Sequence, residues 1–410
     1  MQTGLADFIR DTPEGAEADA ILRKCVHCGF CTATCPTYQI LGDDLDSPRG
    51  RIYLIKRALE GAEVTARTRL HLDRCLTCRA CETTCPSGVR YGRLVDIGRR
   101  VVEERTLRTA WDRLQRAALS FLLPRTGLFA AALSLGRLLR PFLPRALKAK
   151  IPLETRASGP WPAPRHRRKM LVLGGCVQPA LAPGINAAAA RVLDRLGVSL
   201  LEAPGAGCCG GIRFHLNRQE AGRDDMRAVI DAWWPMLEAG GGIEAIVVTA
   251  SGCGVTVKEY GHLLAQDPEY REKAARISAL ARDLCEVIPV DAIAQRTGVA
   301  SVAFQSPCTL QHGQQLRGRV ETLLVRAGYQ LTSVRDAHLC CGSAGTYSLL
   351  QPAMAGELRA RKLAALHEGL PLAIATANIG CLSHLQAGTD TPVRHWIELL
   401  DDALERKMTP

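Results

Sequence analysis

Two cysteine runs decide how the N-terminal part of this chain folds: Cys25-Val-His-Cys28-Gly-Phe-Cys31-Thr-Ala-Thr-Cys35-Pro36 and Cys75-Leu-Thr-Cys78-Arg-Ala-Cys81-Glu-Thr-Thr-Cys85-Pro86. Each run has the spacing C-x2-C-x2-C-x3-C-P, which is typical of proteins that hold a pair of [4Fe–4S] clusters. In that arrangement three cysteines of a run bind one cluster and the fourth binds the other. The spacing therefore predicts a first cluster on Cys25, Cys28, Cys31 and Cys85 and a second cluster on Cys75, Cys78, Cys81 and Cys35.

Zinc is the alternative metal, because cysteine pairs separated by two residues also bind it. Zinc ribbons use two such pairs for each ion, whereas each run here contains four cysteines and ends in Cys-Pro. The two complete runs therefore favour iron–sulfur clusters over zinc in this part of the chain.

The composition is that of a soluble globular protein with two or three domains. The chain has 410 residues, of which 47% are hydrophobic and 23% charged. Its 17 cysteines would suggest disulfides in a short secreted protein, but the start of the chain lacks a basic segment followed by an apolar one. We therefore predict a cytoplasmic protein whose cysteines bind metal.

The net charge of +11 is compatible with a nucleic acid, an anionic membrane surface or an acidic partner. Aromatic residues make up 5% of the chain, and no platform for stacking bases is evident. We predict that the chain has no nucleic acid partner.

Helices are expected around the two cysteine runs. Residues 14–24 have helical spacing, and 91–104 is a further predicted helix, whereas residues 1–15 carry no periodic apolar pattern. Ser47 and Pro48 are a strong helix start, since serine caps helices and proline favours the first helical position. They predict a helix that ends near Leu59.

Residues 120–147 form an apolar stretch that Pro124 and Pro141 interrupt. Its uncharged run is about half as long as a bilayer crossing requires. We expect it to be buried against its own chain or a partner subunit. Contact with a membrane surface, with Arg137, Arg140 and Arg145 toward the headgroups, is the alternative. Residues 157–168 are predicted to be a proline-rich linker.

The remainder of the chain is a duplication. Three landmarks recur at offsets of 132, 132 and 128 residues: Cys176 as Cys308, Cys208-Cys209-Gly210 as Cys340-Cys341-Gly342, and Cys253 as Cys381. Strands and helices alternate between the landmarks, which predicts a parallel sheet with helices in each repeat. Each cysteine falls just past the end of a strand, where open α/β sheets place their sites. We therefore predict one cysteine site per repeat.

These repeats resemble the cysteine-rich CCG domain family, which includes subunits of heterodisulfide reductases and lactate-utilisation proteins. From about Ala16 to Glu405 the chain also resembles the iron–sulfur subunits of bacterial glycolate oxidases. The strings that carry this resemblance are Cys25–Tyr38, Pro48–Lys56, Asn186–Gly197 and His338–Tyr347.

The resemblance implies an α/β protein with an all-α N-terminal module. Its expected parts are a two-cluster ferredoxin-type domain (1–106), a connector and linker (107–168) and two CCG repeats (169–300 and 301–410). It also implies an electron-transfer subunit whose partner subunits carry FAD and oxidise glycolate to glyoxylate. A quinone would be the acceptor, on the inner face of the cytoplasmic membrane. The alternative is a heterodisulfide-reductase-like or lactate-utilisation subunit that acts on another two-electron substrate.

One departure from the CCG pattern affects the expected ligands. The family pattern ends in C-x2-C, but the first cysteine of that pair is replaced by Ala250 in one repeat and by Asn378 in the other. The four cysteines left in each repeat suffice for one [4Fe–4S] cluster or one zinc ion. We predict at least one further cluster, or zinc, among Cys176, Cys208, Cys209, Cys253, Cys308, Cys340, Cys341 and Cys381. His312 and His384 are alternative ligands or hydrogen-bond donors, and Cys285, which has no counterpart in the second repeat, is predicted to be structural.

Overall fold

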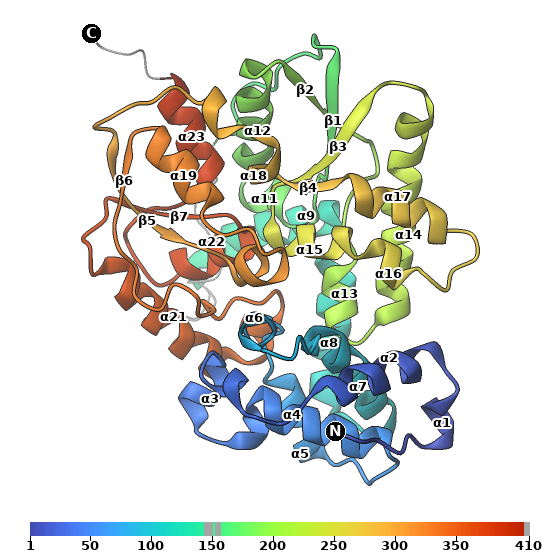
Figure 1. Cartoon of the computed structure of the whole chain (residues 1–410). Coiled ribbons are helices and arrows are strands. Elements are labelled where there is room, and N and C mark those ends of the chain that lie inside the picture. Colours follow the sequence, from blue (N-terminus) through green and yellow to red (C-terminus); the bar gives the residue numbers. More distant parts are fainter. Residues whose placement is uncertain (143–150, 152–156, 406–410) are drawn as a thin grey trace. The chain divides into compact units, whose positions relative to one another are not determined.

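The computed structural model describes residues 1–142, 151 and 157–405 (Figure 1). It contains two compact units. One consists of Met1–Ala117 with His338–Leu358, and the other of Ala118–Ala337 with Arg359–Pro410. The Cys-Cys-Gly loop of the second repeat therefore belongs to the same unit as the two cysteine runs. The division of the chain into four domains remains a prediction.

The first unit is helical, as the sequence predicts. Its elements are α1 (Asp7–Arg10), α2 (Pro13–Lys24), η1 (Phe30–Thr32), α3 (Pro36–Leu41), η2 (Asp44–Asp46), α4 (Pro48–Leu59), α5 (Ala66–Asp73), α6 (Ala80–Thr84), α7 (Tyr91–Arg105) and α20 (Tyr347–Leu350). Helices α8 (Ala110–Leu122) and α21 (Pro352–His367) each run from one unit into the other. The first residues are ordered, contrary to their lack of sequence pattern, because Ile9 of α1 is buried in the core.

Helices α4 and α7 pack against each other and carry the core of this unit. The Ser47 hydroxyl accepts a hydrogen bond from the backbone N of Gly50 at 3.0 Å, which confirms the predicted cap of α4. Gly98 of α7 lies against Ile55 of α4, and a Cβ at this glycine would be 2.5 Å from Ile55 Cγ1. This close approach fixes the spacing of the side chains that the two helices direct toward the cysteines.

The second unit contains two four-stranded parallel sheets, one for each repeat. Their strand orders are β2-β1-β3-β4 and β6-β5-β7-β8. The strands are β1 (Arg168–Val172), β2 (Val198–Glu202), β3 (Ile243–Val248), β4 (Ala281–Asp283), β5 (Ala300–Gln305), β6 (Tyr329–Leu331), β7 (Ala373–Thr376) and β8 (Val393–His395). Identical strand orders confirm the duplication.

Helices and short turns precede, connect and follow these strands. They are α9 (Thr126–Leu139), η3 (Arg140–Phe142), α11 (Gln178–Leu181), α12 (Gly184–Arg195), α13 (Gly211–His215), α14 (Gln219–Glu238), α15 (Ser251–Lys258), α16 (Tyr260–Leu263), α17 (Arg271–Leu280), α18 (Leu284–Val287), η4 (Val290–Ala292), η5 (Thr309–Gly313), α19 (Arg319–Arg326), α22 (Ile379–Gln386) and α23 (Trp396–Glu405).

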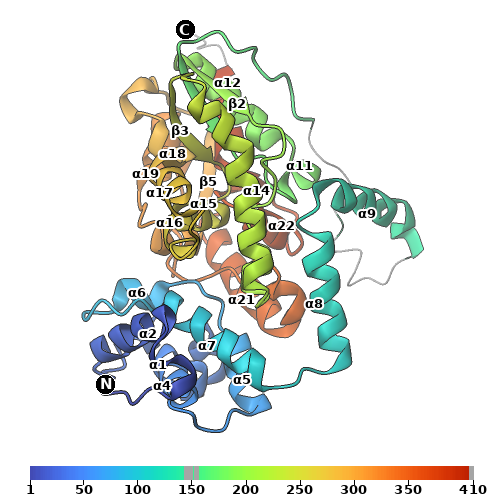
Figure 2. The ribbon, with the colours of Figure 1, turned by 90° about the vertical axis from the view of Figure 1, so that its right-hand side faces the viewer.

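Alternate residues of the first sheet enter two different cores. Met170 and Val172 of β1 pack with the apolar side chains of α12, whereas Leu171 packs with those of α14 and α17. This is the period of two that strands impose, with a helical layer on each face of a parallel sheet (Figure 2).

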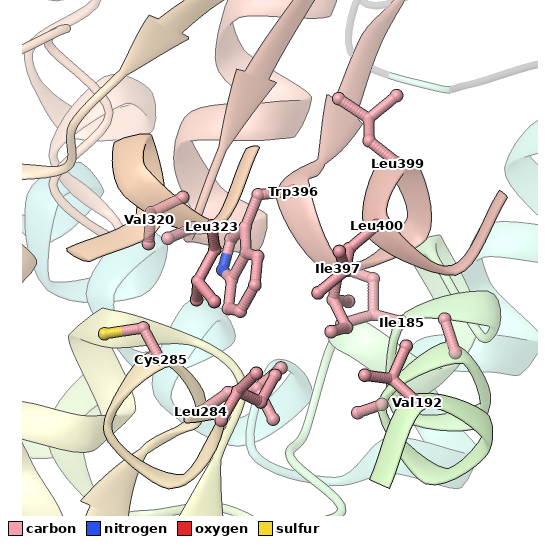
Figure 3. Packing of buried hydrophobic residues seen from close by; sticks show 14 of the residues in the cluster. Ile185, Val192, Leu284, Cys285, Val320, Leu323, Trp396, Ile397, Leu399 and Leu400 are labelled. Atoms are coloured by element: carbon pink, nitrogen blue, oxygen red, sulfur yellow. The ribbon is translucent and has the colours of Figure 1, made fainter. Parts of the chain in front are cut away.

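The two repeats share one hydrophobic core. Helix α12 of the first repeat packs against α23 of the second. Figure 3 shows Ile397 and Leu400 of α23 facing Ile185 of α12, with the buried Trp396 nearby. Because the apolar faces of both sheets meet in this core, the repeats fold as a pair and not as independent beads.

The apolar stretch predicted at 120–147 contains α9, which follows α8 in the chain (Figure 2). In α9 Leu133 is buried, but Leu128, Leu135 and Leu138 are exposed. The described part of the chain does not bury these leucines, so of the expected burial against its own chain or a partner subunit, the partner remains a prediction for them. Residues 143–147, including Arg145, lie outside the described residues.

Over the described ranges, none of the helices taken singly has the length and apolar character needed to cross a membrane. A bent pair, Ala110–Leu122 with Thr126–Phe142, satisfies both requirements when taken together, by length and composition only.

His395, the last residue of β8, links the two repeats. Its Nε2 lies 2.9 Å from the carbonyl oxygen of Thr249, at the end of β3, and its Nδ1 accepts a hydrogen bond from Ile397 N at 3.3 Å. A carbonyl oxygen only accepts, so Nε2 carries the proton and the ring is neutral. Burial lowers the pKa of His395 to about 4.

Replacing His395 with glutamine should reduce the dependence of stability on pH. The pKa is depressed in the folded protein, so the unfolded chain takes up the proton first and stability is lost as the pH falls below about 6.5. Between pH 7.5 and 5.5 this histidine alone should lower the unfolding free energy by roughly 1 kcal/mol. Urea unfolding at the two pH values measures the effect. His215→Gln, at an exposed histidine, should retain the wild-type dependence.

Candidate iron–sulfur sites

The four cysteines predicted for the first cluster line one hollow of about 440 Å³, counting the space open to solvent. Cys25 is buried, Cys31 and Cys85 are partly exposed, and Cys28 is exposed. Pro48, Ile52 and Tyr91 form part of the wall, and Cys81 of the other group also borders this hollow. Four convergent sulfurs are the donor set that a [4Fe–4S] cluster requires, so the residues fit the group.

The other four cysteines line a second hollow of about 310 Å³. Cys35, Cys75 and Cys81 are buried, and Cys78 is partly exposed. In both hollows the fourth cysteine comes from the other run, as the spacing predicts. The structure thus brings together the residues of each predicted set, and the assignment of the ligands remains a proposal.

Both cysteine runs turn through the left-handed backbone region at the same two places. The φ values are 59° at His27 and 85° at Gly29 in the first run, and 52° at Thr77 and 59° at Arg79 in the second. Three of these residues carry side chains, which favour this region poorly. The strained turns curl each run so that its first three cysteines face one hollow.

A buried arginine supports the second hollow. Arg51 of α4 is 1% exposed, and its Nη1 lies 3.0 Å from Thr37 Oγ1 and 4.0 Å from Cys35 Sγ. Its Nη2 lies 3.2 Å from Asp46 Oδ1, and its Nε donates to the carbonyl oxygen of His71 at 2.7 Å. Because a buried cation requires such partners, these contacts hold the guanidinium beside the sulfurs.

Two residues of α7 complete this environment. The Tyr91 hydroxyl donates to Cys75 Sγ at 3.6 Å. Arg99 donates to the carbonyl oxygen of Cys75 at 2.6 Å and to Thr77 Oγ1 at 2.9 Å. The backbone N of Thr77 also donates to Cys75 Sγ, at 3.4 Å. Cys75 therefore sits among donors and cations although it is buried.

Cys75 of the second hollow has a lowered pKa, whereas burial raises the pKa of other thiols in both hollows. Burial raises the pKa of Cys75, but Arg51 and Arg99 outweigh it and the pKa lies below the ordinary value for cysteine. Burial raises the pKa of Cys31 to about 11 and also raises that of Cys25. The pKa of Cys81 is raised as well, by burial and by the neighbouring thiols Cys78 and Cys75. The cations thus act on the second hollow through Cys75.

The Cys-Cys-Gly loop of the second repeat belongs to the same unit and lies near the second hollow. The Tyr347 hydroxyl donates to the carbonyl oxygen of Arg74 at 3.2 Å, and Arg74 Nη1 pairs with Asp46 Oδ2 at 2.8 Å. Burial raises the pKa of Tyr347, and the neighbouring Cys75 and Cys340 act in the same direction. One tyrosine therefore lies close to a cysteine of the second hollow and to a cysteine of the CCG loop.

Two features of the backbone explain why each Cys-Cys-Gly triplet ends in glycine. Gly210 and Gly342 have φ values of 85° and 90°, which residues with a side chain rarely adopt. A Cβ would lie 2.4 Å from the carbonyl oxygen of Gly222 in the first case and 2.7 Å from that of Ala355 in the second. Backbone conformation and close packing thus both require glycine after the two cysteines.

The first repeat brings its four cysteines together. The Cys176 thiol hydrogen-bonds with that of Cys208, and this contact together with burial places its pKa well above the ordinary value. A hydrogen bond with the Cys208 thiol lowers the pKa of Cys209. The hydrogen bond between Cys209 and Cys253 and the burial of Cys209 raise it more strongly, so the pKa of Cys209 lies well above the ordinary value. The Tyr260 hydroxyl donates to the carbonyl oxygen of Cys209 at 3.0 Å. The four sulfurs fit one [4Fe–4S] cluster or one zinc ion.

The second repeat distributes its cysteines over both compact units. Cys308 and Cys381 belong to the second unit, whereas Cys340 and Cys341 belong to the first. Asn378, at the position of the missing family cysteine, donates to Cys381 Sγ at 3.5 Å and accepts from the backbone N of Gly252 at 3.3 Å. Asn378 thus orients a predicted ligand of the second repeat and joins it to the loop of Cys253.

The remaining predicted residues have more ordinary surroundings. His312 is buried, and its Nδ1 faces Arg317 Nη2 at 3.2 Å. Because arginine only donates, the neutral ring carries its proton on Nε2, which disfavours His312 as a metal ligand. The carbonyl oxygen of His384 accepts from Arg359 at 3.4 Å. Cys285 is fully buried in the hydrophobic core, and burial raises its pKa.

One stretch has the literal spacing of a dinucleotide-binding fingerprint. Gly205-Ala-Gly207-Cys208-Cys209-Gly210 reads G-x-G-x-x-G and comes after β2. Cys208 and Cys209 are buried among the other thiols of the repeat, and the next helix, α13, has only five residues. A phosphate cradle requires open backbone N–H groups at the start of a longer helix, so this glycine spacing serves the cysteine site instead.

Replacing Cys209 with serine should remove the metal of the first repeat, since one of its four clustered sulfurs is lost. The expected loss is about four irons, or about one zinc, per chain. Elemental analysis of the purified chain measures it. Cys285→Ser is the matched control, because that thiol is buried but lies in the apolar core, and its metal content should equal the wild type. Equal metal content in Cys209→Ser would show that these thiols do not bind metal.

Comparisons with known proteins account for both parts of the chain. Residues 21–89 match a family described as a 4Fe-4S dicluster domain, and residues 170–258 and 302–386 match the family described as a cysteine-rich domain, CCG. Lactate utilization protein A of Geobacillus thermodenitrificans (strain NG80-2) is 26% identical over 240 residues, which is 55% of this chain and 95% of that protein.

Two relatives cover nearly the whole chain. The probable glycolate oxidase iron-sulfur subunit of Bacillus subtilis (strain 168) is 30% identical over 403 residues, 90% of this chain and 89% of that protein. The glycolate oxidase iron-sulfur subunit of Escherichia coli (strain K12) is 56% identical over 410 residues, 99% of this chain and 100% of that protein. With both cysteine runs and both CCG repeats in place along this length, the chain belongs to the family of glycolate oxidase iron–sulfur subunits.

Proposed function

We propose that this chain is the electron-transfer subunit of a glycolate oxidase complex. FAD-bearing partner subunits oxidise glycolate to glyoxylate, and this chain accepts the electrons and passes them toward a quinone. The observation that carries the proposal is the pair of hollows, each lined by four cysteines drawn from both runs. When bound, [4Fe–4S] clusters supply one-electron chemistry at potentials that their surroundings tune.

The positions of the residues suggest their roles. Cys25, Cys28, Cys31 and Cys85 would hold the first cluster, and Cys35, Cys75, Cys78 and Cys81 the second. In the first repeat Cys176, Cys208, Cys209 and Cys253 would hold a further [4Fe–4S] cluster or zinc, with Cys308, Cys340, Cys341 and Cys381 as the corresponding set of the second. Ala250 and Asn378 leave four thiols in each set, which weighs against the five-thiolate sites of heterodisulfide reductases as the model for this chain.

A peripheral place at a membrane would bring the chain to its quinone. Helix α9 exposes Leu135 and Leu138, and Arg137 and Arg140 lie beside them in the sequence. Apolar side chains next to basic ones suit the interface of an anionic membrane, where quinones are reached.

Metal analysis of the anaerobically purified chain should give about twelve irons and no zinc, since three [4Fe–4S] clusters contain that number. Two clusters belong to the cysteine runs and at least one to the CCG repeats. About eight irons with bound zinc would confine electron transfer to residues 25–85 and make the repeats structural. Zinc alone, without iron, would contradict the proposed function.

Replacing Cys28 with serine should separate the two halves of the reaction. The first cysteine site loses a ligand, so electron flow from glycolate to quinone should fall by at least tenfold, while glycolate still reduces the flavin of the partner subunits. Anaerobic stopped-flow spectroscopy of the complex follows the flavin, and a quinone analogue reports the overall flow. Cys285→Ser should behave as wild type. Failure of flavin reduction in Cys28→Ser would contradict the proposed division between subunits.

A further inference from the structure

The two cysteine sites of the first unit lie in unlike surroundings. We propose that the site of Cys35, Cys75, Cys78 and Cys81 has the higher reduction potential of the two and collects the electrons, and that Arg51, Arg99 and Tyr91 set this order. The inference rests on the proposed function, because it requires that both sites bind [4Fe–4S] clusters.

Adding an electron makes a sulfur-ligated cluster more negative by one charge. Nearby positive charges and hydrogen bonds to the sulfurs therefore raise its potential, and they act more strongly where water is excluded. The question at each site is which charged groups and donors face the cysteines, and how deeply those groups are buried.

At the second site the cations are buried. Arg51 is 1% exposed and lies 4.0 Å from Cys35 Sγ, and Arg99 is 7% exposed and contacts the backbone of Cys75. The Tyr91 hydroxyl adds a hydrogen bond to Cys75 Sγ. Low exposure means that little water screens these charges, so each of them favours the reduced form.

Negative groups at the second site do not cancel these cations. Asp46 is fully buried and pairs with Arg51, but it also pairs with Arg74 Nη1 at 2.8 Å and lies 3.2 Å from His71 Nδ1. Glu82 lies beside Cys81, and one of its carboxylate oxygens accepts a hydrogen bond from Gly92 N at 2.5 Å. Arg79 also lines this hollow. Among the described residues four arginines, Arg51, Arg74, Arg79 and Arg99, thus face two carboxylates, and the balance is positive.

The charged groups around the first site act on its cysteines more weakly than those around the second site. Its arginine, Arg49, pairs with Asp44 at 2.9 Å, and the side chains of this pair are 35% and 45% exposed. The amino group of Met1 donates to the carbonyl oxygen of Cys25 at 2.8 Å. Water screens the Arg49–Asp44 pair, and its two charges nearly cancel. The amino group of Met1 also acts on Cys25, and the backbone N–H groups of His27 and Arg49 donate to the sulfurs of Cys25 and Cys31. One terminal charge and neutral donors have a smaller net effect on the first site than the buried arginines have on the second.

The surroundings of the two sites also fit this direction of flow. At the first site Cys28 is exposed between Val26 and Phe30, which are 69% and 64% exposed, so a partner subunit can approach it. Close to the second site, Tyr347 joins the CCG loop of Cys340 to Arg74. Electrons leave the reduced flavin, which glycolate oxidation supplies, one at a time. They would enter at the first site and collect beside the CCG loop.

A redox titration of the intact complex, followed by low-temperature EPR, tests the proposal. Besides any signal of the CCG repeats, the wild type should show two [4Fe–4S] signals of the first unit at different potentials. Cys209→Ser, which should lose the metal of the first repeat, identifies a signal that belongs to the repeats. Cys28→Ser identifies the signal of the first site, because it changes a ligand there, and the signal it alters should be the one reduced at the lower potential.

Substitutions near each site then test the cause. Tyr91→Phe removes one hydroxyl and keeps the ring, and it should shift the higher-potential signal to lower potential while the other signal stays. Arg51→Gln should produce a larger shift in the same direction, and Arg51→Lys, which keeps the charge, a smaller one. Arg49→Gln is the matched control at the first site and should leave the higher-potential signal unchanged. Iron content and circular dichroism establish that each variant is folded, and Tyr91→Phe alone suffices if the Arg51 variants do not fold.

Two results would overturn the inference. The first is that Cys28→Ser alters the higher-potential signal. The second is that Tyr91→Phe does not change the potential of that signal. If the wild type lacks two [4Fe–4S] signals altogether, the proposed function itself fails. With both signals present and only their order reversed, the proposed function stands and this inference alone is wrong.

Discussion

The convergence of eight cysteines on two hollows is the constraint on which the N-terminal unit depends. Beside the second hollow the chain buries two cations, Arg51 from α4 and Arg99 from α7. A buried guanidinium is itself costly, which explains why Asp46, Thr37 and the carbonyl oxygen of His71 surround Arg51. Arg99 reaches the backbone of Cys75 from α7, which packs against α4, and Gly98 permits the close approach of α7 to Ile55 of α4. Cysteine geometry, charge and helix packing are therefore parts of one arrangement.

In the CCG repeats the constraint is the close packing of the Cys-Cys-Gly turn against a helix, and both repeats satisfy it with glycine. Cysteines at the ends of parallel strands converge because those ends lie at one edge of a sheet. The Cys-Cys-Gly turn must then pass close to a helix backbone, at Gly222 in the first repeat and at Ala355 in the second, and this passage excludes a side chain. Both repeats have kept the same turn, because the close packing admits only glycine at Gly210 and Gly342. The shared core between α12 and α23 explains why neither copy stands alone.

Local patterns made much of this predictable from the sequence. The cysteine sets, the capped helix at Ser47 and the strand–cysteine order of the repeats all depend on residues close together in the chain. The short strands β4 and β8 could not be predicted, because three residues such as Ala281-Arg-Asp283 carry too little pattern to distinguish them from a loop. The partners of the sulfurs could not be predicted either: Arg51 precedes Cys75 by 24 residues and Tyr347 lies 273 residues from Arg74, and only the tertiary fold brings them together.

The two copies of the CCG turn have diverged in the residues after the glycine. In the first repeat Arg213, three residues after Gly210, pairs with Asp225 of its own unit at 2.5 Å. In the second repeat the turn continues through Ser343 to Tyr347, whose hydroxyl contacts the backbone that leads into Cys75. The turns are otherwise alike, since the glycine of each has a positive φ and passes close to a helix backbone. The difference after the glycine is the expected result when one copy acquires a contact with the ferredoxin-type module, since Tyr347 belongs to the same compact unit as the two cysteine runs and Arg213 does not.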